Sequence, residues 1–185
     1  MNHGSGSPTG GERAIVLGLA EWHVSSDRDD VLVCLGLGSC VAVILYDAVA
    51  GVGGMAHTVL PDSAAGRSAA SGAKFVDLAV PMLIEEMSAA GARRMRLVAD
   101  LVGGACMLSS LQQSALGQVG PRNIEATRRA LARAKVRIRT DETGGSLGRS
   151  ARLRVADGGL EVSTAGGARA WPRREAATAP SGRSE

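Results

Sequence analysis

Residues 31–60 constrain the fold most, because apolar runs and tight turns alternate along this stretch. The runs are rich in Val, Leu and Ile, and they stop at Gly36, Asp47 and Pro61. Short apolar runs that are bounded by such residues are typical of buried strands. We therefore expect strands over residues 31–35, 41–46 and 52–60, with turns at residues 36–39 and 47–50.

A cysteine and a histidine lie within this stretch. If Ala48 and Val49 are the central residues of a hairpin turn, Cys40 lies directly opposite His57. Side chains that face each other in this way have Cβ atoms about 4.5–5.5 Å apart. A thiol and an imidazole at that separation can share a proton, so we predict this register; a longer loop is the alternative.

Cys40 follows Gly38 and Ser39, which places it at a predicted sharp turn. A nucleophile at such a turn is exposed, and nearby backbone N–H groups can stabilise an oxyanion. A neighbouring imidazolium lowers the pKa of a thiol and favours the reactive thiolate. The alternative is a buried cysteine that packs as a small apolar residue, together with a structural histidine. The residues alone leave both interpretations open.

Two segments, LGLGSCVAVILYD and GVGGMAHTVLPDS, resemble the CheD family of chemoreceptor glutamine deamidases, which serve bacterial and archaeal chemotaxis. The resemblance extends from about Ile15 to about Val162. It includes three further matches, at Gly103-Gly104-Ala105, at residues 120–126 (GPRNIEA), and at Thr143-Gly144-Gly145 with Arg149-Ser150.

The resemblance implies an α/β fold, a layered sandwich of mixed and largely antiparallel sheets with flanking helices, related to the catalytic domain of cytotoxic necrotizing factor toxins. It also implies that Cys40 is the nucleophile and His57 its base. Cys34 stands where the family usually carries a threonine as the third catalytic residue, and a thiol accepts hydrogen bonds only weakly. The residues expected to bind the oxyanion or the substrate are Gly38, Ser39, Gly103 and Gly104.

The function that the resemblance implies is deamidation of glutamine side chains on chemoreceptors. The reaction proceeds through a cysteine thioester, releases ammonia and needs no metal or cofactor. The implied partners are the cytoplasmic helices of methyl-accepting chemotaxis proteins and a CheC-type phosphatase. Because Cys34 replaces the usual threonine, the alternative is a weakened or inactive adaptor that only binds these partners.

Composition bears on the remaining function classes. Residues 122–154 carry 10 basic and 3 acidic side chains, but aromatic residues make up only 2% of the chain, so few side chains can stack on bases. We therefore expect no nucleic acid partner. The three cysteines form no C-x-x-C pair, which disfavours zinc and predicts reduced thiols in the cytoplasm. No signal peptide and no membrane-length apolar run is recognisable, so we expect no insertion into a membrane.

The rest of the chain predicts one domain over residues 13–165, between a disordered segment at 1–12 and a flexible tail at 166–185. Pro81 is a misfit in the first of two expected helices and predicts a kink or a later helix start. Asp157-Gly158 predicts a hairpin turn. The helices are expected over residues 73–90 and 121–134, and the further strands over residues 14–19, 94–100, 136–139, 152–156 and 160–163.

Overall fold

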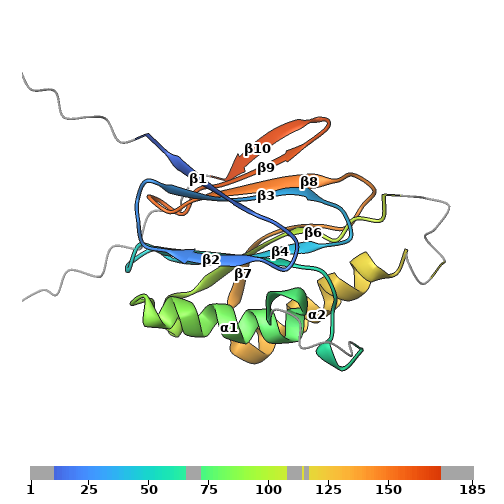
Figure 1. Ribbon diagram of the computed structural model, residues 1–185, viewed down its shortest axis with the longest axis horizontal. Coiled ribbons are helices and arrows are strands. Elements are labelled where there is room, and N and C mark those ends of the chain that lie inside the picture. Colours follow the sequence, from blue (N-terminus) through green and yellow to red (C-terminus); the bar gives the residue numbers. More distant parts are fainter. Residues whose placement is uncertain (1–10, 66–71, 108–113, 115–116, 172–185) are drawn as a thin grey trace, which may run out of the picture.

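Two five-stranded sheets stack on each other, and two helices cover the outer face of the second sheet (Figure 1). The computed structural model describes residues 11–65, 72–107, 114 and 117–171. The predicted layered α/β sandwich is confirmed, with both helices on the same side.

Each sheet contains one parallel pair of strands, β1 with β3 in the first sheet and β6 with β7 in the second. The remaining neighbours are antiparallel, as predicted. In spatial order the first sheet consists of β1 (Arg13–Leu17), β3 (Asp30–Leu37), β8 (Arg149–Arg154), β9 (Leu160–Thr164) and β10 (Gly167–Trp171). The second consists of β2 (Trp22–Ser25), β5 (Val52–Thr58), β4 (Val41–Asp47), β6 (Val98–Gly103) and β7 (Arg137–Thr143).

The helices are α1 (Val76–Ala89) and α2 (Val119–Ala134). α1 starts at Val76 and not at residue 73, but this start is still too early to place Pro81 in the first turn, where a proline would be accommodated. Pro81 still lies inside the helix, where its ring nitrogen cannot donate to the carbonyl one turn back. Neither helix in the described part of the chain is long and apolar enough to cross a membrane. Single 3-10 turns occur at Ser63–Ala65, Gly72–Lys74 and Arg94–Arg96.

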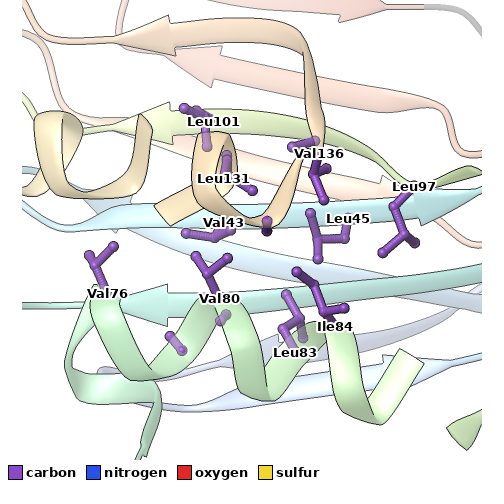
Figure 2. Close-up of a cluster of buried hydrophobic side chains, with 14 of the residues drawn as sticks. Val43, Leu45, Val76, Val80, Leu83, Ile84, Leu97, Leu101, Leu131 and Val136 are labelled. Atoms are coloured by element: carbon purple, nitrogen blue, oxygen red, sulfur yellow. The ribbon is translucent and has the colours of Figure 1, made fainter. Parts of the chain in front are cut away.

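One apolar layer fills the space between the second sheet and the helices (Figure 2). It is built from aliphatic side chains, as the scarcity of aromatic residues requires. Burying each Val or Leu contributes about 1.5–3 kcal/mol, so this layer fixes the helices on the sheet. The side chains labelled in Figure 2 are Val43, Leu45, Val76, Val80, Leu83, Ile84, Leu97, Leu101, Leu131 and Val136.

A second apolar layer lies between the two sheets. Successive residues of a strand point to opposite faces. In β4, therefore, Val43 and Leu45 contact the helical layer, whereas Ala42 and Ile44 belong to the layer between the sheets. Because β4 is central and buried on both faces, its sequence is continuously apolar rather than alternating.

Two predicted boundaries are wrong. Residues 94–96 form a 3-10 turn, and the strand expected at 94–100 instead runs from Val98 to Gly103. Residues 167–171, assigned to a flexible tail, form β10 because they pair with β9 through the whole strand. The pairing is local, because β9 and β10 form a hairpin whose two-residue loop is Ala165-Gly166, a turn signal that the prediction did not use. The expected disorder at 1–12 and the rest of the tail fall largely on residues 1–10 and 172–185, which lie outside the described residues.

Candidate functional site

The cysteine turn, residues 38–40, joins β3 to β4 and is held by the segment that follows β6. The Ala105 N–H donates to the Gly38 carbonyl, and the Gly104 N–H donates to the Cys40 carbonyl, both at 2.7 Å. These contacts join segments about 65 residues apart in the chain, so the turn is fixed by tertiary structure and not by its own sequence.

Glycine is required at both residues of the Gly103-Gly104 pair. Their φ angles are +111° and +68°, which side chains rarely tolerate. A Cβ on Gly103 would lie 2.3 Å from the Cys40 carbonyl oxygen. The backbone of this pair therefore lies directly against the segment that carries Cys40, whereas the predicted role of the two glycines in binding oxyanion or substrate stays a prediction. The Gly104 N–H is already donated to Cys40, so it holds the turn rather than facing a substrate.

Asn123 fastens the cysteine turn from the side of α2. Its Nδ2 donates to the Ser39 carbonyl and to the Val59 carbonyl, each at 2.9 Å. Val59 follows β5, two residues beyond His57. One fully buried amide therefore connects the turn that carries Cys40 to the strand that carries His57.

The predicted register of the β4–β5 hairpin is wrong by two residues. Ala42, and not Cys40, lies opposite His57. The reason is a longer turn at residues 48–51, which Gly51 closes with a φ of +66°. A shift of two keeps every side chain on its original face. Cys40 lies in the turn just before the first paired residue, Val41, and packs against the same apolar layer as Ala42, the residue opposite His57.

The turn between β1 and β2 orients the imidazole of His57. Nδ1 lies 3.3 Å from the Leu17 carbonyl oxygen, which can only accept, so Nδ1 carries the proton. The backbone of His57 bonds the same turn, at Ala20 and Glu21. In the neutral ring Nε2 is then a free acceptor, and it is buried without a hydrogen-bond partner among the described residues.

Burial lowers the pKa of His57, although the bond to the Leu17 carbonyl and the charge of Glu21 oppose the shift. Burial likewise raises the pKa of the partly exposed Cys40 thiol, against the effect of its own backbone N–H. Both groups are therefore neutral near pH 7. The pair rests as a thiol beside an imidazole with a free nitrogen, an arrangement suited to proton transfer during attack rather than to a standing thiolate.

Cys34 lies in β3 directly opposite Leu17 and is buried between the sheets. Burial and the nearby Cys40 charge raise the pKa of its thiol to about 12. No hydrogen bond joins it to His57 within the described residues, because the Leu17 carbonyl takes Nδ1. The orienting position predicted for Cys34 is occupied by a backbone group.

Two contributors to this arrangement escaped the sequence reasoning. The Leu17 carbonyl leaves no signal, since every residue has one. Asn123 does lie within the matched segment at residues 120–126, but nothing in that segment indicates which strand its amide reaches. An asparagine at the start of a helix is more often a cap than a long-range donor.

With this geometry in view, comparisons with known proteins are informative. The family model described as CheD chemotactic sensory transduction matches residues 59–164, more than half of the chain. The chain belongs to the CheD family. The matched range begins two residues after His57, so the family assignment does not itself rest on the Cys40–His57 pair.

Curated relatives match over more of the chain. A protein from Symbiobacterium thermophilum named "Probable chemoreceptor glutamine deamidase CheD" is 43% identical over 83% of this chain and 94% of its own length. One of the same name from Desulforamulus reducens is 38% identical over 84% and 93%. "Probable chemoreceptor glutamine deamidase CheD 2" from Geobacter metallireducens is 42% identical over 81% and 93%.

Among solved structures, the Bacillus licheniformis hypothetical protein YfiH aligns with 75% of this chain and 62% of its own. The TM-score is 0.44 at 14% identity, a likeness too distant to carry an argument.

Proposed function

We propose that this protein is a protein-glutamine glutaminase that converts glutamine side chains of chemoreceptors to glutamate. Relatives at 34–43% identity carry the name of that activity. The observation that carries the proposal is Nε2 of His57, which is buried without a hydrogen-bond partner among the described residues, in a ring oriented by Leu17. His57 lies opposite Ala42, and Cys40 packs against the same apolar layer as Ala42.

In the first half of the reaction, the Cys40 sulfur attacks the carbon of the substrate amide while Nε2 of His57 accepts the thiol proton. A C–S bond forms, and the amide oxygen becomes an oxyanion. The C–N bond then breaks as His57 returns the proton to the nitrogen, and ammonia leaves. In the second half, His57 accepts a proton from water, which attacks the thioester. The C–S bond breaks, Cys40 regains its proton, and glutamate remains.

The oxyanion needs donors, and the cysteine turn supports two. The Gly38 and Ser39 carbonyls are held by Ala105 and Asn123. Peptide bonds here are trans, since the described residues contain no cis bond, so each N–H points away from the carbonyl of its own peptide unit. The N–H groups of Ser39 and Cys40 therefore point away from Ala105 and Asn123 and are the donors of this proposal.

The proposed partners are the cytoplasmic helices of methyl-accepting chemotaxis proteins, with a CheC-type phosphatase as a further candidate, and the proposed compartment is the cytoplasm. Cys34 at the usual threonine position favours a second candidate function, an adaptor that binds these partners without turnover. The Leu17 carbonyl weakens that alternative, because the imidazole is oriented without Cys34.

The test is incubation with the cytoplasmic fragment of the cognate receptor, with receptor peptides analysed by mass spectrometry and ammonia measured in parallel. Conversion of defined glutamines to glutamate, absent with Cys40→Ala, supports the glutaminase. Receptor binding without ammonia release supports the adaptor and contradicts the glutaminase.

A further inference from the structure

Asn123 has bonds that packing alone does not explain. It lies in α2 with no exposed surface, and its Nδ2 reaches two carbonyls on separate segments, at Ser39 and Val59. Carbonyl oxygens only accept, so the nitrogen of the amide must face them. The two bonds thus fix the orientation of the side chain.

The other end of the amide differs from Nδ2. Oδ1 of Asn123 is buried and has no hydrogen-bond partner among the described residues. A buried acceptor without a partner is destabilising, and most such groups in folded proteins are paired. A side chain retained despite this cost points to a role beyond stability.

The Ser39 carbonyl and the Cys40 N–H belong to one planar peptide unit. A donor that fixes the carbonyl therefore also fixes the direction of the N–H on the opposite side. We propose that Asn123 is a positioning residue, which holds the plane of the Ser39–Cys40 peptide and so aims the Cys40 N–H at the oxyanion of acyl transfer. This inference rests on the proposed function.

The position of α2 fits this role. The helix runs beneath the second sheet (Figure 1). A Cβ on Gly120, at its start, would lie 2.5 Å from the Gly104 carbonyl oxygen, so the helix is seated directly on the glycine turn that holds Cys40. The second bond of Asn123, to Val59, ties the same amide to the end of the strand that carries His57.

Two reactions at Cys40 separate positioning of the oxyanion donor from general disruption. Acylation by p-nitrophenyl acetate passes through an oxyanion: sulfur attacks the ester carbonyl as His57 accepts the thiol proton, the C–O bond breaks, p-nitrophenolate leaves, and an acetyl thioester forms. Alkylation by iodoacetamide is a displacement of iodide at carbon and develops no oxyanion. Both rates are measured on the full chain, and modification at Cys40 is quantified by peptide mass mapping.

The variants are Asn123→Ala, which removes the donor, and Asn123→Asp, which places an acceptor against two carbonyls. The control is Thr127→Val, because Thr127 is equally buried in the same helix and its hydroxyl donates to the backbone carbonyl of Asn123, at 2.8 Å. The variant therefore tests whether a change beside the Asn123 backbone has the same effect as a change in the Asn123 amide. We expect Cys40 acylation to fall roughly 10- to 100-fold in both Asn123 variants, somewhat less than when an oxyanion donor is removed outright. The alkylation rate of Cys40 in these variants is expected to stay within about threefold of the wild-type rate. Thr127→Val is expected to change neither the acylation rate nor the alkylation rate.

Equal losses of acylation and alkylation would overturn the proposal, whether or not cooperative unfolding persists. So would unchanged acylation, or a wild-type Cys40 that is acylated no faster than a free thiol. Receptor deamidation, measured alongside, separates this inference from the proposed function. Normal deamidation by Asn123→Asp overturns positioning and leaves the glutaminase standing. A selective loss of acylation in a protein that never deamidates receptor supports positioning and contradicts the glutaminase.

Discussion

Strand β4 begins at the cysteine turn and ends at Asp47, and different interactions stabilise these two ends. At the Cys40 end, three consecutive carbonyls accept hydrogen bonds from neutral donors, two backbone N–H groups and the Asn123 amide. Among the described residues, no ion pair involves this turn.

At the other end, the fully buried carboxylate of Asp47 pairs with Arg96 at 2.9 Å. It also accepts from the backbone N–H groups of Val49, Ala50 and Arg93. Burial acts to raise the pKa of Asp47, but these hydrogen bonds outweigh it, and the pKa is lowered. Charge thus stabilises one end of the strand. At the other end, the three carbonyls of the cysteine turn are held by neutral donors, whose dipoles are fixed before any reaction begins.

The largest expected effect comes from removing the Cys40 thiol, which should abolish the reaction and leave the structure of this end of β4 unchanged. Cys40→Ala should reduce receptor deamidation at least about 1,000-fold, because the nucleophile is lost. The free energy of unfolding should change by less than about 1 kcal/mol, since the side chain is small and partly exposed. Cys106→Ala is the control and should keep its activity. Deamidation and urea unfolding are measured together, and an active Cys40→Ala protein would refute the nucleophile.

The next largest effect comes from removing the charge of Asp47 at the other end of β4. Asp47→Asn should lower the free energy of unfolding by about 3 kcal/mol, because Arg96 loses its partner at a buried site. Activity per folded molecule should not change. Glu125→Gln is the matched control, since the exposed Glu125–Arg129 pair spans 3.5 Å and contributes about 0.5 kcal/mol or less. Equal losses in the two variants would mean that the charge on Asp47 has no special structural role.

The contributions of His57 and Asp47 to stability should be lost over different pH ranges. The pKa of His57 is lowered from 6.5, so the unfolded chain takes up a proton first, and stability falls as the pH drops below about 6.5. The pKa of Asp47 is lowered from 3.8, so its contribution is present above about 3.8 and is lost only as the pH falls further. Urea unfolding across this range should show the first loss abolished by His57→Gln and the second reduced by Asp47→Asn. A single loss unaffected by either variant would contradict both assignments.

The smallest effect concerns Cys34. Its Thr variant restores the usual family residue, but Nδ1 of His57 is already bonded to Leu17. We therefore expect Cys34→Thr to change the deamidation rate by less than about threefold, below the tenfold that one well-placed hydrogen bond of about 1.4 kcal/mol can supply. Steady-state kinetics of the two proteins on one receptor fragment give the ratio. A tenfold gain would return the orienting role to position 34.

The strands were largely predictable because their signals are local. The apolar run at residues 41–46 and the Asp157-Gly158 turn each specify their own structure, and the observed strands follow them. The hairpin register was not predictable, because the Ala48-Val49 dipeptide does not specify the length of the turn. For the candidate site, the sequence could indicate only groups whose chemistry resides in a side chain, as in the proposed pair Cys40 and His57. Nothing in the sequence indicated a backbone group, such as the Leu17 carbonyl, or a contact between distant segments, such as that made by Asn123.

The bond from Asn123 to Ser39 spans 84 residues of sequence, which bears on how the protein is made. At ribosomal rates of about 5–20 residues per second, the cysteine turn is synthesised roughly 4–17 s before the amide that fastens it. A nascent or truncated chain that ends before residue 123 therefore contains Cys40 and His57 without their tether. Synthesis and folding order thus delay completion of the candidate site until α2 has been made and has docked.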